Sequence, residues 1–403
     1  MSKWIEHKVG ELCSAIYSGG TPSTSHPEYW NGEYNWLSSG ETSNRYIKKT
    51  EKTITKEGIN GSSTKLAKNG TLVIASAGQG KTRGQASILK CDTYINQSII
   101  ALAGKSEILD TTFLFYNMML RYEELRVRSD ASSTRGSITT DMLKKLPILL
   151  PDLATQNHIA DILSAYDDLI EANNRRIELL EQAAQELYKE WFVRLRFPGH
   201  EKAKFENGLP EGWMVKRMND FCYVTDGTHD TPKPVETGIP LVTGRCISNG
   251  FIDFNVAYNI SNKDHEGIKK RSGLKSGDIL FSNIGTVGNS CIVDYDREFS
   301  VKNVIIFKPE TMRDTAYLYY WMTSSIMQEI FATQTNGASQ QFVGLTFMRR
   351  YKLLIPQNNI LDAFADKILP FIEQKKILHQ NNQKLVAQRD LLLPRLMSGK
   401  LEV

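Results

Sequence analysis

The stretch from residue 159 to residue 192 reads IADILSAYDDLIEANNRRIELLEQAAQELYKEWF, and it has the composition of one long helix. Residues 152–194 contain neither proline nor glycine, the two residues that interrupt helices most strongly. Apolar side chains recur three and four positions apart for about four heptads, which predicts a stripe along one helix face. About 40 residues of helix would be roughly 60 Å long at 1.5 Å per residue. The stripe consists of Leu163, Tyr166, Ile170, Ile177, Leu180, Ala184, Leu187 and Trp191.

A second stretch, residues 358–393, carries a comparable stripe that Lys375 and Asn382 interrupt. One domain cannot bury a stripe this long, so we expect the two helices to pack against each other like a coiled coil. The alternative for either helix alone is a surface helix packed on its own domain. If a pseudo-two-fold axis relates the halves of the chain, the helices run antiparallel, and Asn173 with Asn382 is expected to set their register. The second stripe consists of Phe364, Ile368, Phe371, Leu378, Leu385 and Leu392.

Outside these helices the chain repeats itself. The string WIEHKVGELC at 4–13 is echoed by WMVKRMNDFC at 213–222, and LPILLP at 146–151 by YKLLIP at 351–356. A period of about two hundred residues is too long for a solenoid and fits a domain plus a connector. Short apolar runs between turn residues predict strands in each copy, at 71–75, 98–102, 278–281 and 304–307. One helix per copy is predicted, at 112–126 and 316–331.

The predicted fold class is therefore α+β: two β-rich domains in a tandem pseudo-repeat, separated by a pair of long antiparallel, coiled-coil-like helices. The predicted segments are a first domain at 1–151, a central helix at 152–197, a second domain at 198–356 and a C-terminal helix at 357–403.

Composition sets only broad limits. The 403 residues are 41% hydrophobic, enough for two cores, and the net charge of +4 is too small to name a partner. Residues 1–150 carry 19 Lys/Arg against 14 Asp/Glu, and 151–197 carry 5 against 9, which fits a nucleic-acid-facing domain and a solvated surface equally well. Five scattered cysteines indicate a reducing compartment rather than disulfides or a zinc site. Without a signal-peptide pattern or a run of about 18 apolar residues, we expect a cytoplasmic protein and no membrane partner.

The stretch ASAGQGKT at 75–82 fits a relaxed phosphate-binding loop. A helix must follow such a loop, yet residues 83–89 are typical of the return strand of a hairpin. No later strand ends in a convincing magnesium-binding Asp, and the second copy has SNIGTVGN at 282–289 instead. We therefore favour a glycine-rich hairpin tip that meets polynucleotide phosphate. A plain surface hairpin whose cations keep it soluble stays open.

Other catalytic signatures are missing from the sequence. The seven histidines have no metal-ligand spacing, and neither an Asn-Pro-Pro-aromatic loop of adenine methylation nor a glycine-rich cofactor fingerprint followed by a helix occurs. We expect no catalytic residues, no metal and no cofactor in this chain.

Three groups of motifs carry a family resemblance. They are SGGTPS at 18–23 with YWNG at 29–32 and WL at 36–37; IADIL at 159–163 with DDLIEAN at 167–173 and EWF at 190–192; and RDLLLPRLMSG at 389–399. LPEGW at 209–213 fits as well. Over its whole length the chain resembles the specificity subunits of type I restriction–modification systems, which act in host defence and DNA methylation.

The resemblance implies that each domain is a target-recognition domain that reads one half of a split DNA target. The helices would set the unspecified spacer, and two adenine-methylating subunits and motor–nuclease subunits would dock on the body. S-adenosylmethionine, ATP and magnesium would then belong to those partners.

Candidate DNA contacts rest on side-chain chemistry and paired location, because recognition residues do not transfer within this family. Gln can pair two-pronged with adenine and Arg with guanine, at about 1–3 kcal/mol of discrimination each; Lys81 and Arg83 are expected to contact phosphates. In the first domain the candidates are Ser38, Ser39, Lys81, Thr82, Arg83, Arg135 and Ser137. In the second they are Thr228, His229, Arg245, Asn283, Thr286, Gln340 and Gln341. The alternatives to a DNA-recognition subunit are a stand-alone enzyme, either a P-loop NTPase or a nuclease, and a two-headed scaffold that does not bind DNA.

Overall fold

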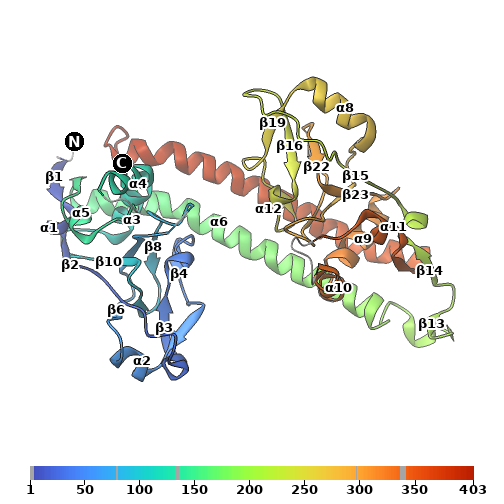
Figure 1. The fold of residues 1–403 in the computed structure, drawn as a ribbon, viewed down its shortest axis with the longest axis horizontal. Helices are drawn as coiled ribbons and strands as arrows, with labels where there is room; N and C mark the ends of the chain where they lie inside the picture. Colours follow the sequence, from blue (N-terminus) through green and yellow to red (C-terminus); the bar gives the residue numbers. More distant parts are fainter. Residues whose placement is uncertain (1–3, 79, 133–135, 296, 336–341) are drawn as a thin grey trace. The chain divides into compact units, whose positions relative to one another are not determined.

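The computed structural model describes residues 4–78, 80–132, 136–295, 297–335 and 342–403 (Figure 1). The chain forms two compact units: Met1–Asn173 with Gln380–Val403, and Asn174–His379. The two long helices, α6 (Leu153–Tyr188) and α12 (Asn358–Met397), therefore each contribute one half to each unit. The α+β fold class with two tandem domains is confirmed, while the segment boundaries proposed from the sequence stay a prediction.

The first unit contains a five-stranded and a four-stranded sheet. Both strands predicted here exist, and the return strand predicted after the glycine-rich stretch is β8, antiparallel to β7. The strands of the larger sheet, in order, are β2 (Cys13–Ser18), β10 (Ile99–Gly104), β7 (Leu72–Ala75), β8 (Ala86–Leu89) and β4 (Tyr46–Ile47). Those of the smaller are β5 (Lys52–Ile54), β3 (Trp30–Leu37), β9 (Thr93–Ile95) and β6 (Lys65–Ala67).

The helices α1 (Val9–Leu12), α3 (Thr111–Leu120) and α5 (Thr140–Lys144) contact the larger sheet of this unit, and α2 (Lys56–Asn60) contacts the smaller one. The helix predicted at 112–126 is in fact two, α3 and α4 (Tyr122–Ser132), which meet at Arg121, where the backbone leaves helical geometry (ψ 11°). Asp110 caps α3 by accepting the N–H of Phe113 at 2.6 Å.

The second unit repeats this order. Its predicted strands are β20 and β23, and its predicted helix is again two, α9 and α10, separated by the extended residue Ser324. Its sheets are β15 (Tyr223–Asp226), β23 (Val304–Lys308), β20 (Ile279–Ser282) and β21 (Ser290–Ile292), and β19 (Tyr258–Ile260), β16 (Ile239–Thr243) and β22 (Ser300–Lys302). Its helices are α7 (Met218–Phe221), α8 (Asn262–Ser272), α9 (Met312–Thr323), α10 (Ser325–Thr335) and α11 (Leu345–Arg350); short pairs are formed by β12 (Phe205–Glu206) with β13 (Leu209–Pro210) and β17 (Ile247–Ser248) with β18 (Phe251–Ile252).

The repeated strings pair with each other. In the first unit β1 (Ile5–Lys8) is antiparallel to β11 (Pro147–Leu150); in the second, β14 (Met214–Arg217) is antiparallel to β24 (Lys352–Ile355). Each copy therefore closes its first segment on its last, immediately before the long helix that follows it. This pairing explains why both strings recur together.

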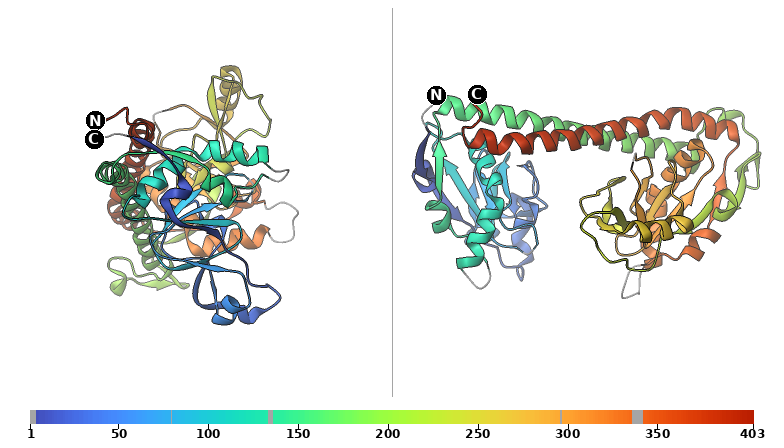
Figure 2. Two further views of the ribbon diagram at one scale, coloured as in Figure 1. Left: turned by 90° about the vertical axis from the view of Figure 1, so that its left-hand side faces the viewer. Right: turned by 90° about the horizontal axis from the view of Figure 1, so that it is seen from above.

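Within each unit the two helix halves run antiparallel and side by side, as Figure 2 shows for the first unit. There Asp167 contacts Arg389, and Asn173 Nδ2 donates to Asn382 Oδ1 at 2.8 Å. A residue later in α6 thus contacts a residue earlier in α12, as antiparallel helices require. In the second unit Glu181 contacts Lys375, which is only 6% exposed. The two asparagines meet as the register hypothesis requires; whether they set the register stays a prediction.

The structure buries or half-buries all fourteen residues of the two stripes. Several also join a domain core: Leu163 packs in the core of the first unit, and Phe364 and Ile368 pack in that of the second. Each helix therefore packs part of its apolar stripe into a domain core and part against the other long helix. Beyond Tyr188, α6 continues as one π-helical turn, Lys189–Val193, which places Trp191 in the second core. In the described part of the chain, no helix has the length and apolar character needed to cross a membrane.

Candidate nucleic-acid interface

Strand pairing gathers five segments at one edge of the second unit. β15 ends at Asp226 opposite Ile305, β20 ends at Ser282 opposite Val304, and β16 ends beside β22. Because these strands end together, the segments that follow them meet at the same place. We name this the second loop edge, comprising residues 227–230, 243–246, 283–289, 302–303 and 342–343.

Hydrogen bonds join the segments of the second loop edge. Thr286 Oγ1 donates to the carbonyl oxygen of Gly244 at 3.0 Å, and the N–H of Val343 donates to that of Asn283 at 2.9 Å. The N–H of Asn303 donates to the carbonyl oxygen of Thr228 at 3.1 Å. The edge is thus a connected surface rather than a set of independent loops.

The first unit builds a matching edge. β2 ends opposite the start of β10, β7 ends opposite Ile99, and β3 ends beside Ile95. The N–H of Ser76 donates to the carbonyl of Ser98 at 2.8 Å, and that of Ile138 to the carbonyl of Ser76 at 2.9 Å. We name this the first loop edge, comprising residues 19–21, 38–41, 76–78, 80–85, 96–97 and 136–138.

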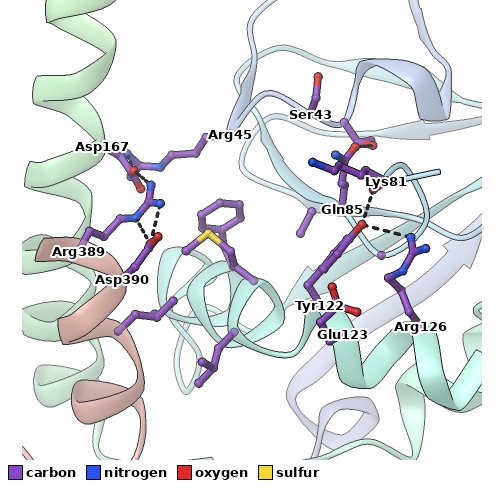
Figure 3. Close-up of a pocket in the computed structure, with 17 residues that line it drawn as sticks. Ser43, Arg45, Lys81, Gln85, Tyr122, Glu123, Arg126, Asp167, Arg389 and Asp390 are labelled. Carbon is purple, nitrogen blue, oxygen red and sulfur yellow. Dashed lines mark hydrogen bonds and ion pairs between the residues drawn. The ribbon is translucent and has the colours of Figure 1, made fainter. Parts of the chain in front are cut away.

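Four candidates of the first domain lie on this edge with room to act. Ser38 and Ser39 are both half-buried; Ser38 precedes the short helix Ser39–Glu41, and its hydroxyl donates to Glu41 Oε1 at 3.2 Å. Lys81 is exposed at the β7–β8 hairpin, and Thr82 beside it is half-buried. The carbonyl oxygen of Lys81 accepts the hydroxyl of Tyr122 at 2.7 Å, which fixes the hairpin backbone (Figure 3).

Arg83 is used differently from what the sequence led us to expect. It is only 9% exposed; its Nη1 donates to the carbonyl oxygen of Gly136 at 2.6 Å, and its Nη2 lies 2.8 Å from Asp130. The guanidinium thus ties the hairpin to the segment after α4, and its proposed phosphate contact stays a prediction. Ser137 is half-buried with its Oγ 3.4 Å from the carbonyl oxygen of Ser76, and Arg135 lies outside the described residues.

In the second domain the candidates also divide. His229, Thr286 and Arg245 are exposed, the last in the short helix Gly244–Cys246. Thr228 is buried, and the amide of Asn283 is buried and donates to the carbonyl oxygen of Val343 at 3.2 Å. Those two side chains support the edge from below. Gln340 and Gln341 lie outside the described residues.

Sequence reasoning missed several polar residues on the two edges or in direct contact with them: Thr21, Gln97, Asp226, Arg271 and Asn303. No local pattern marks them, because strand pairing brings them together from 76 residues apart in the first unit and 74 in the second. The one local sign is a glycine, Gly19 or Gly227, just after a strand.

A cavity of about 840 Å³ lies in the first unit beside the β7–β8 hairpin (Figure 3). On one side Arg126 Nη1 donates to Tyr122 Oη at 3.1 Å; on the other, Arg389 pairs with Asp167 and Asp390. These polar groups satisfy one another, so the cavity wall is a joint between the domain and the helices.

Arg45 completes that joint. Its Nη1 lies 2.9 Å from Asp168 and 3.7 Å from Asp167, and the guanidinium lies 4.3 Å from the ring centroid of Tyr46. Its Nε and Nη2 are buried and have no hydrogen-bond partner among the described residues. The cation–π interaction with the Tyr46 ring stabilises part of the buried positive charge. Burial, and then the neighbouring Asp167 carboxylate, raises the pKa of the Tyr116 hydroxyl, which therefore stays protonated and donates to Asp167 at 2.6 Å.

Burial makes two of the cysteines poor nucleophiles. Burial raises the pKa of Cys13 to about 11 and that of Cys222 to about 12, so neither forms a thiolate nucleophile near neutral pH. All five cysteines are free. Among the described residues, no three His, Cys, Asp or Glu side chains gather closely enough to hold a metal ion.

Comparisons with known proteins agree with this duplicated architecture. The family model of the type I restriction modification DNA specificity domain matches residues 1–182 and again 210–387. The MjaIX specificity subunit of Methanocaldococcus jannaschii is 26% identical over 422 residues, covering 99% of this chain and 94% of that protein. The HindI specificity subunit of Haemophilus influenzae is 21% identical over 471 residues, covering 100% of both.

A solved structure shares the fold. The type I restriction–modification S subunit from M. genitalium superimposes with a TM-score of 0.60 at 16% sequence identity, covering 98% of this chain and 96% of that one. The two matches to one family model, at the two copies of the repeat, settle the classification. The chain belongs to the family of type I restriction–modification specificity subunits.

Proposed function

We propose that this chain is the non-catalytic DNA-recognition subunit of a type I restriction–modification complex, and that each unit reads one half of a bipartite target. The observation that carries the proposal is the pair of loop edges: one framework, built twice, with different polar side chains on each copy. Short loops and strand ends can enter the major groove, where all four base pairs differ. Exposed Lys81 and Arg245 offer the charge that such a surface needs.

The long helices supply the spacer in this proposal. α6 and α12 have 36 and 40 residues, about 54 and 60 Å of helix. Half-sites that face the same side of DNA are about 34–36 Å apart per helical turn, a distance that such a rod can span. A fixed helix pair predicts a fixed number of unspecified base pairs between the two halves of the target.

Partners and cofactors complete the proposal. Exposed Leu169, Leu179 and Leu391 on α6 and α12 offer apolar surface for the methyltransferase and motor–nuclease subunits. S-adenosylmethionine, ATP and magnesium would be held by those subunits, and the complex would act on DNA in the cytoplasm. The stand-alone NTPase is disfavoured, because β8 rather than a helix follows Thr82.

A long-read map of N6-methyladenine tests the proposal. Cells expressing this chain with its neighbouring methyltransferase subunit are compared with cells that lack only this chain. The expected result is a new split motif with two defined halves and a fixed gap. As a control, the methyltransferase is first shown to be active together with a different specificity subunit. If this active methyltransferase then methylates no motif with the present chain, the proposal fails. Filter binding then tests the scaffold alternative, which predicts no DNA affinity at low or moderate salt.

A further inference from the structure

We infer that one amide side chain on each loop edge, Gln97 in the first unit and Asn303 in the second, reads a base of its half-site, and that Thr21 and His229 position these amides. This inference rests on the proposed function. It identifies a matching pair of specificity-determining positions, whereas the loop edges by themselves identify only a surface.

The two positions are comparable because each lies beside a glycine loop of the same construction, although Asn303 adopts a φ of +51° and Gln97 does not. A Cβ added at Gly19 would lie 1.8 Å from the carbonyl oxygen of Ile95, and one at Gly227 would lie 2.2 Å from that of Val301. No side chain fits at either glycine, so both loops cross the neighbouring strand at close range. The next N–H in each loop donates to that same carbonyl oxygen, at 3.1 Å in the first unit and 3.0 Å in the second.

On this shared backbone the side chains differ. Two residues after the glycine stands Thr21 in one unit and His229 in the other. Each meets an amide from the turn that precedes β10 or β23, the strand that pairs with β2 or β15. Thr21 Oγ1 donates to Gln97 Oε1 at 2.5 Å; His229 Nδ1 lies 3.1 Å from Asn303 Oδ1. A constant frame carrying a variable polar pair is what two domains that read different half-sites require.

Among the residues that the structure describes, each amide side chain has one hydrogen-bonding contact and keeps its other groups for a ligand. Thr21, Gln97 and His229 are exposed, and Asn303 is half-buried. The hydroxyl of Thr21 occupies Gln97 Oε1, which leaves two N–H donors on Nε2 and one lone pair on Oε1. Anchoring a flexible side chain in advance reduces the entropy lost on binding. An amide offering a donor and an acceptor matches N6 and N7 of adenine.

The second unit adds a buried support. Asp226 is 7% exposed; its Oδ2 lies 2.8 Å from Nε2 of His229, and its Oδ1 pairs with Arg271. One carboxylate thus fixes both an imidazole and a guanidinium whose side chains remain exposed. The corresponding residue of the first unit is Ser18, opposite Ile100 as Asp226 is opposite Ile305, so the first amide lacks this charged support. We therefore expect the second position to be held more rigidly.

A cluster of cations lies beside the loop that carries His229. A cavity of about 700 Å³ beside the 227–230 loop is lined by Lys233, Lys263 and Arg271, against the two acids Asp230 and Asp264. These side chains come from the loop and from α8. They supply sequence-independent contacts, and the amide supplies the sequence-dependent one.

The test uses the purified complex of this chain with its methyltransferase partner, acting on duplexes that carry the mapped target with single base-pair changes. Asn303→Gly removes the amide without strain, because φ at this residue is +51°. We expect discrimination (the ratio of kcat/KM values) to fall by about 5- to 140-fold at one base pair of one half-site. Asn303→Asp, which only accepts hydrogen bonds, should move the preference at that position from adenine to cytosine. Gln97→Ala and Gln97→Glu should do the same in the other half-site.

Each unit is the control for the other, and Asn69→Ala adds a matched control, because this exposed amide lies at the turn before β7, at the opposite strand end. The positioning role has its own readout. Thr21→Ser keeps the hydroxyl and should keep the target, whereas Thr21→Val should relax the same base pair as Gln97→Ala; His229→Phe should act likewise in the second half.

Two results would overturn the inference: an unchanged target in the Gly and Asp variants, or an equal loss of rate on every duplex. A wild-type chain that gives no split target with an active partner overturns the proposed function instead. The two failures are therefore distinguishable.

Discussion

Replacing Asp167 by alanine should destabilise the first unit far more than replacing its neighbour Asp168. The Asp167 side chain is 10% exposed and lies beside Arg389 and Arg45, with which it pairs (Figure 3). It also accepts the Tyr116 hydroxyl at 2.6 Å. Asp168 is 60% exposed, and of these three partners it contacts only Arg45, at 2.9 Å. The two residues share a helix and a charge, so burial and partner number are what separate them.

The structure sets the size of the effect. Removing one partner of a buried ion pair costs about 3–5 kcal/mol, because the other charge stays buried without compensation. The hydroxyl of Tyr116, a fully buried residue, would also lose its acceptor. For Asp167→Ala we therefore expect a loss of about 4 kcal/mol in the free energy of unfolding of the first unit. For Asp168→Ala we expect about 1 kcal/mol or less, as for an exposed pair.

Scanning calorimetry of the full chain measures both losses, and hydrogen exchange assigns them to a unit. In a unit of this size 1 kcal/mol shifts the midpoint by about 2–4 °C, so Asp167→Ala should lower one transition by roughly 8–16 °C. Faster amide exchange should appear in β7 and α3 of the first unit and not in β20 or α9. Equal shifts for Asp167→Ala and Asp168→Ala would refute the inference that buried charges hold the first domain to the two long helices.

Three further predictions concern other parts of the chain. Lys81→Ala should weaken binding on every DNA sequence and reduce the slope of log K against log salt by about one, as titration at several salt concentrations would show; a changed target would contradict a phosphate contact. Burial lowers the pKa of His379, whose ring stacks on Phe251, so below about pH 6.5 the unfolded chain binds more protons than the folded one. Stability should thus be full above that pH and fall as pH drops, and His379→Phe should flatten the dependence measured by urea unfolding between pH 7.5 and 5.5. Replacing Asn173 and Asn382 together by leucine should allow other helix registers or oligomers, seen as a changed mass in light scattering; an unchanged mass and unfolding midpoint would reject the register role.

The long helices could be predicted from sequence because their period is local and repeated. Four heptads of apolar residues without glycine or proline leave few alternatives, and the strand at 71–75 is buried throughout, as its unbroken apolar run indicates. The splitting of the two shorter helices was not predictable in the same way. Arg121 and Ser324 are not breakers by type, and only tertiary packing selects their non-helical geometry.

Side-chain roles at the loop edges were harder to predict, for a different reason. An arginine at a hairpin tip is usually solvated, yet Arg83 turns inward because Gly136 and Asp130, both about 50 residues away, meet it there. Thr21 and Gln97 have no common pattern in the sequence, since the strands between them create their contact. The duplication itself was more informative than either copy, because the second copy lacks the Gly-Lys-Thr of the first and so argues against a nucleotide site.

Duplication also separates the residues that fold the chain from those we expect to read DNA. Gly19 and Gly227 are fixed by a neighbouring carbonyl oxygen at close range, so neither can change without moving a strand. Thr21, Gln97 and His229 are exposed, and surface substitutions usually alter stability by less than about 0.5 kcal/mol. An altered polar pair can therefore shift a base preference while the sheets, the helix joint and the spacing between half-sites stay as they are. On this reasoning each half of the target can change independently of the other and of the gap between them.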